Sequence, residues 1–223
     1  MIRTLALLAA AALVGCANGG SQTMPPSQTL AQAHAPFQSQ STMRRQSTCP
    51  AAPGGSGVLP DGDFSQATDP GSGETGLKAG TNFAPDWTVT RDTIDFEGTG
   101  GPWTAPNGMC SVDLDGTPGA GGAKTVAFPT NDGSVYQVSF QFSGNGACPP
   151  RYKVMIVAAA GTGQTFTWDT RNHHDAQHGF FQQETWNFTA VGPKTSIAFV
   201  SRDPHPETAL CGPIIAGVAV AQQ

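Results

Sequence analysis

A strict alternation of apolar and polar residues over positions 136–142 constrains the fold of this 223-residue chain more than any other feature. Tyr136, Val138, Phe140 and Phe142 fall on one side of an extended backbone, and three polar residues fall on the other. A period of two is typical of a β-strand with one packed face. The same pattern returns in four shorter runs, at residues 87–89, 166–168, 186–188 and 197–199.

Turn-forming stretches rich in Gly, Pro, Asn and Asp separate these runs, and no segment shows a convincing helical period. Short strands at roughly even spacing predict an all-β domain, an antiparallel β-sandwich or jelly roll over residues 58–223. A domain of this length is large enough to bury a sizeable core.

Residues 1–15 carry the marks of an export signal. A basic start at Arg3 precedes an apolar stretch from Leu5 to Val14, which is too short to span a bilayer. The run Leu13-Val14-Gly15-Cys16 resembles the lipobox at which bacterial lipoproteins are cleaved and acylated. We therefore expect Cys16 to be lipidated and to hold the protein in the bacterial cell envelope. Ala17, in place of an aspartate, indicates the outer membrane, and the alternative is a plain secretory signal.

Residues 16–57 are dominated by Gln, Ser, Ala and Pro, and their few apolar residues follow no period. Such a segment buries too little apolar surface to offset its ordering entropy, so we expect a flexible tether. Random-coil scaling gives it a reach on the order of 35 Å.

The charge balance excludes several partners. The formal net charge is −5, only 12% of the residues are charged, and no basic cluster occurs beyond Arg44-Arg45. We therefore expect no nucleic-acid partner and no membrane contact other than the lipid anchor. Four cysteines remain after Cys16, and in an oxidising compartment they predict two disulfides, with three pairings open. Their wide spacing argues against a zinc site.

Four motifs in the predicted sandwich resemble a known family when taken in order. They are Leu59-Pro60-Asp61-Gly62-Asp63-Phe64, Pro85-Asp86-Trp87-Thr88-Val89, Ser111-Val112-Asp113-Leu114-Asp115-Gly116 and Cys211-Gly212-Pro213-Ile214-Ile215. This order is similar to the DUF642 and bacterial choice-of-anchor C families. The resemblance implies a galactose-binding-domain-like jelly roll that binds polysaccharide rather than cutting it. It also implies a disulfide between Cys148 and Cys211, which leaves Cys49 to pair with Cys110.

Jelly-roll binding modules often hold a structural calcium ion, which needs six to eight oxygen ligands. The chain departs from the family pattern where carboxylates are common, with Ser65 after Phe64 and with Ala216 after the last motif. Asp61 and Asp63 could still bind calcium, and the alternative is that they cap turns. We therefore predict no cofactor.

Two pairs of carboxylates have a spacing similar to that of the catalytic carboxyl groups of glycosidases. Asp113 with Asp115, and Asp95 with Glu97, stand two residues apart, so that on a strand each pair shares a face at about 6.5 Å. This spacing overlaps that of glycosidase carboxyl groups. The alternative is structural, because Asp115 precedes a glycine and opens a turn. Motifs for a nucleophile are absent, so we predict that the protein is not an enzyme.

Histidines cluster at His173, His174 and His178, and imidazoles so close together suit zinc or copper. Adjacent histidines on a flexible loop rarely converge, so a solvated loop is the favoured interpretation and no metal site is predicted. His205, between two prolines, is expected in a turn.

Sugar binding requires an aromatic face together with groups that donate and accept hydrogen bonds. Trp103 lies in a loop-like stretch and is the candidate platform, with a structural role as the alternative. Asn145, Arg151 and Tyr152 are the candidate polar partners near the expected disulfide. The sequence thus predicts a non-catalytic envelope lipoprotein that binds carbohydrate or polysaccharide. The alternatives are a structural or protein-contact module and, less favoured, a surface glycan hydrolase.

Overall fold

The computed structural model describes residues 47–172, 180–203 and 210–223. Several sequence predictions lie outside these residues, namely the signal peptide, the lipidation of Cys16, most of the tether, and the four histidines His173, His174, His178 and His205. None of the helices in the described part of the chain is long and apolar enough to cross a membrane.

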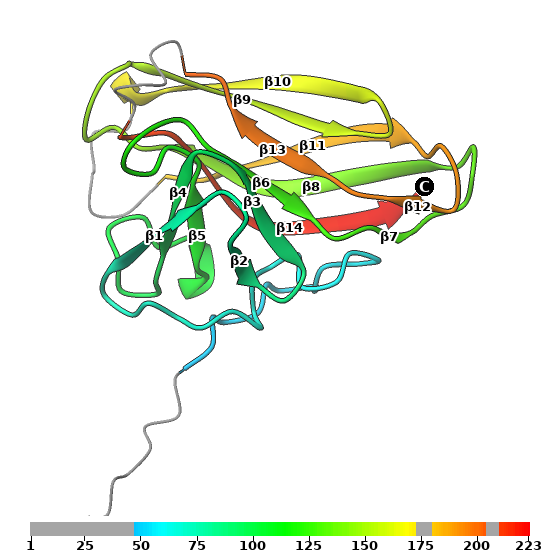
Figure 1. Ribbon diagram of the computed structural model, residues 1–223, viewed down its shortest axis with the longest axis horizontal. Coiled ribbons are helices and arrows are strands. Elements are labelled where there is room, and N and C mark those ends of the chain that lie inside the picture. The colour runs from blue at the N-terminus through cyan, green and yellow to red at the C-terminus, as the bar shows by residue number, and fades with distance from the viewer. Residues whose placement is uncertain (1–46, 173–179, 204–209) are drawn as a thin grey trace, which may run out of the picture. The chain divides into compact units, whose positions relative to one another are not determined.

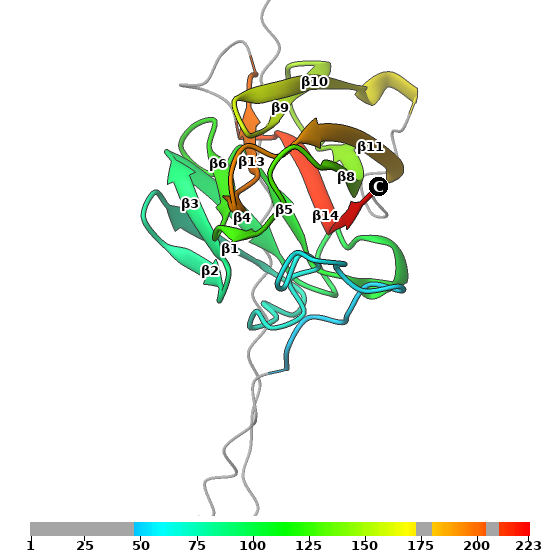
Figure 2. The same ribbon diagram turned by 90° about the vertical axis from the view of Figure 1, so that its right-hand side faces the viewer.

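The domain is a jelly-roll β-sandwich of two antiparallel six-stranded sheets (Figures 1 and 2). Sheet 1 has the strand order β1 (Glu74–Lys78), β4 (Thr93–Glu97), β5 (Ser111–Asp113), β14 (Pro213–Gln222), β8 (Val135–Gly144) and β11 (Gln182–Thr189). Sheet 2 has the order β10 (Thr162–Asp169), β9 (Tyr152–Ala159), β13 (Ala198–Ser201), β6 (Gly122–Thr125), β3 (Trp87–Arg91) and β2 (Asn82–Ala84). The remaining elements are the short strands β7 (Phe128–Pro129) and β12 (Lys194–Thr195) and the 3-10 helices η1 (Pro106–Gly108) and η2 (Thr170–Asn172).

The all-β prediction is confirmed, and the alternation that led to it has a simple cause. The apolar residues of β8 point between the sheets, where Phe140 packs edge-on against Phe166 of β10 and Phe199 of β13. A second aromatic group gathers around the buried Phe64, which contacts Trp87 edge-on. Edge-to-face aromatic pairs are favoured in cores, and these two groups hold the sheets together.

Local turn chemistry sets the register of the longest hairpin. β9 and β10 pair residue by residue from Thr162 opposite Ala159 to Asp169 opposite Tyr152. Ala160 and Gly161 connect them with positive φ angles of 48° and 78°. A two-residue loop with both φ angles positive matches the right-handed twist of the flanking strands.

The described end of the predicted tether lies against the sandwich. Residues 47–57 were assigned to the tether for their composition, but they pack against the sandwich (Figure 2). Cys49 is bonded to Cys110, Thr48 forms a β-bridge with Thr68, and Gly57 forms one with Val220 of β14. These backbone pairings and the disulfide outweigh the low apolar content of the segment.

Candidate functional site

The solvent-facing side of sheet 1 is lined by amides and hydroxyls. Because side chains alternate along a strand, the residues of β8 that do not enter the core point outward. The same holds for β11, whose exposed Gln183 stands opposite Gln141 of β8. The outward set on these two strands is Gln137, Ser139, Gln141, Gln183, Thr185 and Asn187.

A groove of about 250 Å³ lies on this face. Its walls come from β8, β11 and β14, from the segment 52–55 and from η1. Its lining is Ala52, Pro53, Gly55, Asn107, Met109, Ser139, Gln141, Gln183, Gly217 and Ala219. No charged side chain is among these residues, and four of them carry amide or hydroxyl groups.

Two local features shape the groove. Gly217, with a φ of 53°, sits in an irregular part of β14 where the register with β8 shifts between Ala216 and Ala219. A Cβ atom at Gly217 would lie 3.2 Å from Cε of Met109, so the absence of a side chain keeps the floor open. Asn107 lies in η1 with a φ of 62°, a conformation that asparagine adopts more readily than most residues.

The segment 52–55 is held in place from two sides. The backbone N–H of Ala52 donates to Oδ2 of Asp63 at 2.8 Å, and the N–H of Gly55 donates to the carbonyl of Ala52. The Cys49–Cys110 disulfide ties the start of this segment to the loop that carries Asn107 and Met109. One wall of the groove is thus fixed covalently.

The amides in the groove are prepared for hydrogen bonding. Gln141 Nε2 donates to Gln183 Oε1 at 3.0 Å, which fixes the orientation of both side chains. Gln141 Oε1 and Gln183 Nε2 make no hydrogen bond to any described residue, so an acceptor and a donor are available side by side. Phe181 packs against the cluster of Ala105, Met109 and Ala216, of which Met109 also lines the groove.

The binding residues expected from the sequence do not form one surface. Trp103 is only 7% exposed, so it presents almost no ring surface to a ligand. Its carbonyl accepts a hydrogen bond from Ser111 Oγ, which makes its position structural. Asn145 is buried as well, and its Nδ2 donates to Asp113 Oδ2 at 2.8 Å.

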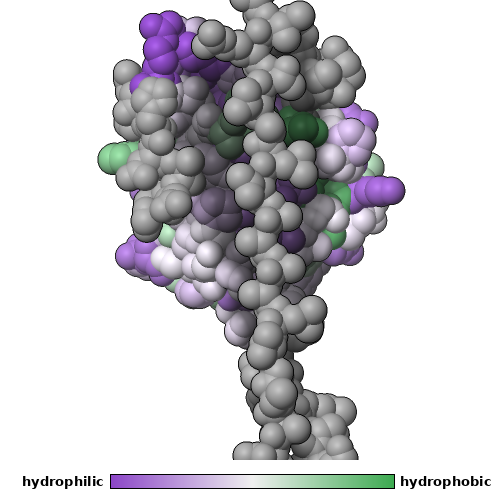
Figure 3. Space-filling view, turned by 90° about the vertical axis from the view of Figure 1, so that its left-hand side faces the viewer, coloured by the Kyte–Doolittle hydropathy of each residue, from purple (hydrophilic) through white to green (hydrophobic). Residues whose placement is uncertain are grey.

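Arg151 and Tyr152 remain at the surface, at the start of β9. Tyr152 is 48% exposed, and the Arg151 guanidinium lies 4.5 Å from the centre of its ring while pairing with Asp169. Figure 3 shows hydrophobic residues scattered among hydrophilic ones on the described part of the face that it draws. Arg151 is already engaged by Asp169, so Tyr152 is the more available of the two.

The carboxylate pairs are buried rather than open to a substrate. Asp95, Glu97 and Asp113 lie together on the outward side of β4 and β5, with Asp95 directly opposite Asp113, and loops cover them. Burial and the neighbouring Glu74 charge raise the pKa of Glu97 to about 8 and that of Asp95 to about 6. Carboxyl groups that cleave a glycosidic bond must flank it, and side chains this deeply buried do not.

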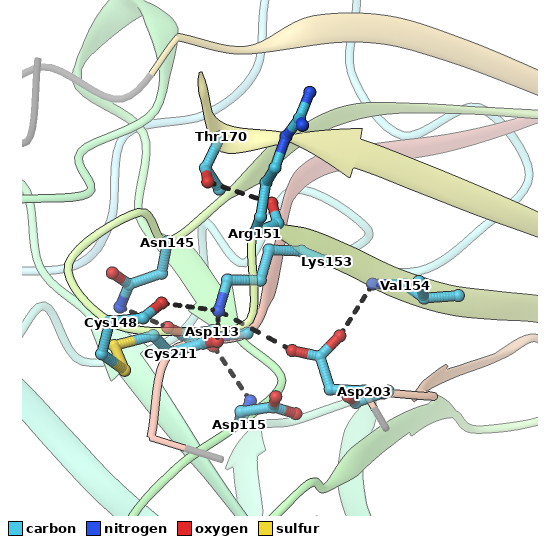
Figure 4. Close-up of polar contacts among 12 residues, drawn as sticks. Asp113, Asp115, Asn145, Cys148, Arg151, Lys153, Val154, Thr170, Asp203 and Cys211 are labelled. Carbon is cyan, nitrogen blue, oxygen red and sulfur yellow. Dashed lines mark hydrogen bonds and ion pairs between the residues drawn. A yellow bond between two sulfur atoms is a disulfide. The ribbon is translucent and has the colours of Figure 1, made fainter. Parts of the chain in front are cut away.

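Asp113 is integrated into the core by three donors. Its Oδ1 accepts from the N–H groups of Asp115 and Gly212 at 2.9 Å each, and its Oδ2 accepts from Asn145 (Figure 4). These hydrogen bonds reduce the cost of burying the carboxylate, but burial still raises the pKa of Asp113 well above its ordinary value.

Asp61 and Asp63, considered as calcium ligands or turn caps, hold backbone in place. Asp61 Oδ1 accepts from the N–H of Gln66 at 2.9 Å, and Asp63 accepts from Ser65 at one oxygen and from Ala52 at the other. Among the described residues, Cys49, Asp69 and Cys110 also lie within 4.8 Å of one another. Their sulfurs are joined in a disulfide and so cannot act as thiolate ligands.

The fold is a jelly-roll β-sandwich, and it carries a polar groove without charged side chains. The chain belongs to the DUF642 family, whose model, described as "Protein of unknown function (DUF642)", matches residues 57–221. The pairs Cys49–Cys110 and Cys148–Cys211 in the structure are those that the family resemblance implied.

Solved structures with a similar course of the chain are distant in sequence. A structure titled "CBM4 structure and function" is 14% identical with a TM-score of 0.39, covering 74% of this chain and 99% of that chain. A family 35 carbohydrate binding module from Clostridium thermocellum is 11% identical with a TM-score of 0.41, covering 68% and 99%. CBM35 from Paenibacillus barcinonensis is 14% identical with a TM-score of 0.39, covering 67% and 99%. A comparison with curated proteins found no match.

Proposed function

We propose that this domain binds a neutral carbohydrate in the groove on sheet 1 and that it does so without cleaving it. The observation that carries the proposal is the lining, in which amides and hydroxyls occur without any charged side chain. Sugar hydroxyls both donate and accept hydrogen bonds, and an amide offers both functions at once. Phe181, which packs against a cluster that includes Met109 of the lining, is our candidate for an aromatic contact with the ligand.

Lipidation of Cys16 belongs to the same proposal. An acylated cysteine followed by a tether would hold the domain at the envelope, most simply at the outer membrane. The lipobox-like run before Cys16 supports this placement. The mass of the protein extracted from membranes tests it, since an unmodified Cys16 would remove the anchor.

Replacing both groove glutamines should weaken binding selectively. For the protein from Ala17 onward, tested on a panel of neutral polysaccharides by affinity electrophoresis, we expect Gln141→Ala with Gln183→Ala to raise Kd about tenfold. The reason is the loss of two oriented hydrogen-bonding groups from the groove. The matched control is Gln164→Ala, an exposed glutamine of β10 on the other sheet. Equal loss in both proteins, or no binding to any member of the panel, would reject the groove.

Filling the groove should have a similar effect by a different route. Ala219 is half-buried in the lining, and in Ala219→Leu the larger side chain would occupy space that the ligand needs. We expect Kd to rise at least tenfold while the thermal midpoint stays within a few degrees. Unchanged affinity in this variant would place the ligand elsewhere. Release of reducing ends during the assay would instead indicate a hydrolase.

A protein-contact role has a separate observation in its favour. A wider, shallower depression of about 650 Å³ lies on the outward side of sheet 2. Ile156, Ala158 and Ala198 contribute apolar surface to it, and Lys124 and Lys194 also line it. An apolar surface with charged residues beside it suits a protein partner better than a neutral sugar.

A further inference from the structure

A lysine lies inside the sandwich with no exposure to solvent. Lys153, the second residue of β9, points between the sheets, and its Nζ donates to the carbonyls of Cys148 (3.1 Å) and Cys211 (Figure 4). The disulfide between these two cysteines fixes both acceptors. Burying an ammonium ion is costly, and burial lowers the pKa of Lys153 despite the neighbouring aspartates.

Asp203 faces this amine from the adjoining chain. It follows β13, and its Oδ2 lies 3.8 Å from Lys153 Nζ, with both side chains completely buried. This separation is too long for a hydrogen bond. Oδ1 accepts from the N–H of Val154 at 2.8 Å, so the carboxyl group is held with one oxygen bound and the other turned toward the amine.

The donor count at Lys153 agrees with a neutral amine. An uncharged amine has two N–H bonds, and the carbonyls of Cys148 and Cys211 accept both. The remaining position on nitrogen is the lone pair, which is nucleophilic. A charged ammonium would need a third acceptor, and among the described residues Asp203 is not within hydrogen-bond distance.

A second carboxyl group stands beside the pair. Asp115 is fully buried, and neither of its oxygens accepts a hydrogen bond of good geometry from any described residue. Burial first, and the negative charge of Asp203 among the further causes, raise the pKa of Asp115 to about 7. Asp115 therefore binds and releases a proton near neutral pH, as a general acid or base requires.

We propose that Lys153 and Asp203 join in an intramolecular amide, an isopeptide bond, with Asp115 as the proton carrier. Lys153 Nζ attacks Cγ of the protonated Asp203 carboxyl, and the N–H of Val154 stabilises the negative charge that develops on Oδ1. Asp115 takes one proton from the nitrogen and delivers one to Oδ2, which leaves as water. One C–N bond forms, one C–O bond breaks, and no oxidant or co-reactant is needed.

The bond would tie β9 to the chain after β13 at a position that disulfide chemistry already reinforces. Unlike the Cys148–Cys211 bridge, an amide does not respond to thiols. It would also remove a buried amine and a buried acid from the interior together. Asp113 and Asp115 would then be the remaining acids at this site, with Asn145 bonded to Asp113.

Peptide mapping of the full chain tests the bond directly. After reduction, alkylation and trypsin digestion, a free Lys153 allows cleavage that yields peptide 154–171 and a separate peptide 203–223. The cross-linked protein instead yields 152–171 joined to 203–223, one water molecule lighter than the two together. We expect the joined species, with fragment ions placing the link at Lys153 and Asp203. Recovery of the separate peptides alone would overturn the proposal and leave a buried ion pair.

Two variants test the chemistry of the step. Asp115→Asn keeps the shape but cannot carry the proton, so we expect separate peptides from a protein whose β-sheet circular dichroism is unchanged. A joined peptide in this variant would overturn the role of Asp115. Asp203→Asn should give the same joined product with loss of ammonia in place of water. Lys194→Arg, an exposed lysine elsewhere, is the control and should leave the link intact.

Discussion

Replacing Cys49 and Cys110 together with alanine is expected to lower the free energy of unfolding by about 4 kcal/mol. The two cysteines are 61 residues apart, and their cross-link restricts the unfolded chain over that whole loop. Urea denaturation with constant m-values would measure the loss. The affinity of the amide-lined groove for carbohydrate should fall as well, because the disulfide holds the segment that forms one of its walls.

Single replacements separate the cross-link from packing. Cys49→Ala and Cys110→Ala each abolish the bridge, so each should lose nearly as much stability as the double variant. A pure packing effect would make the two single losses add up to the double loss. If the free energy of unfolding of the double variant is less than about 1 kcal/mol below that of the native protein, the disulfide does not have this stabilising role.

Glu97→Gln is expected to stabilise the domain at pH 8 by an amount of the order of 3 kcal/mol and to change little at pH 5. Glu97 is 1% exposed, and burial with the Glu74 charge raises its pKa from 4.5 to about 8. The folded state therefore binds this proton more tightly than the unfolded state does. Its contribution to stability is complete below pH 4.5 and is lost as the pH rises toward 8. An uncharged glutamine avoids that loss.

The measurement is the thermal midpoint of both proteins at intervals between pH 5 and pH 8. The native protein should become less stable across this range, since the pKa values of Asp95 and Asp115 are raised in the same direction, to about 6 and about 7. Glu97→Gln should show a flatter profile. Glu184→Gln, a half-buried glutamate of β11, controls for the loss of one carboxyl group. Parallel profiles in the native protein and Glu97→Gln would refute the assignment.

The strands were predictable because each carries its own signal. The alternation at residues 136–142 depends only on neighbours in the chain, and it placed Phe140 inside and Gln141 outside. The groove could not be predicted in the same way, because Gln141 meets Gln183 only through the pairing of β8 with β11, which the local sequence does not specify. Its wall comes from residues 52–55, whose composition alone indicated a tether.

The sequence could not show that certain residues with exposed-looking surroundings in the chain are buried in the fold. Trp103 lies in a glycine- and proline-rich stretch typical of an exposed loop, yet it is buried, with its carbonyl bonded to Ser111. Asn145 owes its burial to Asp113, which is 32 residues away in the chain. Nothing in the local pattern around Lys153 distinguishes it from a surface lysine, since its partners come from the loops after β13, before β14 and before β9.

β14 lies in the middle of sheet 1, between β5 and β8, although it is the last strand along the chain. Before it inserts, sheet 1 consists of two separate parts, β1-β4-β5 and β8-β11. On the β5 side, the hydrogen bond from Gly212, just before β14, to Asp113 links residues that are 99 apart in the chain. Pairing over such a distance makes folding slow, and a chain emerging from a ribosome or a membrane channel cannot close this sheet until residues 213–222 are free. Sheet 1 therefore closes only after β14 has emerged, and a product truncated before β14 is expected to be cleared by proteases.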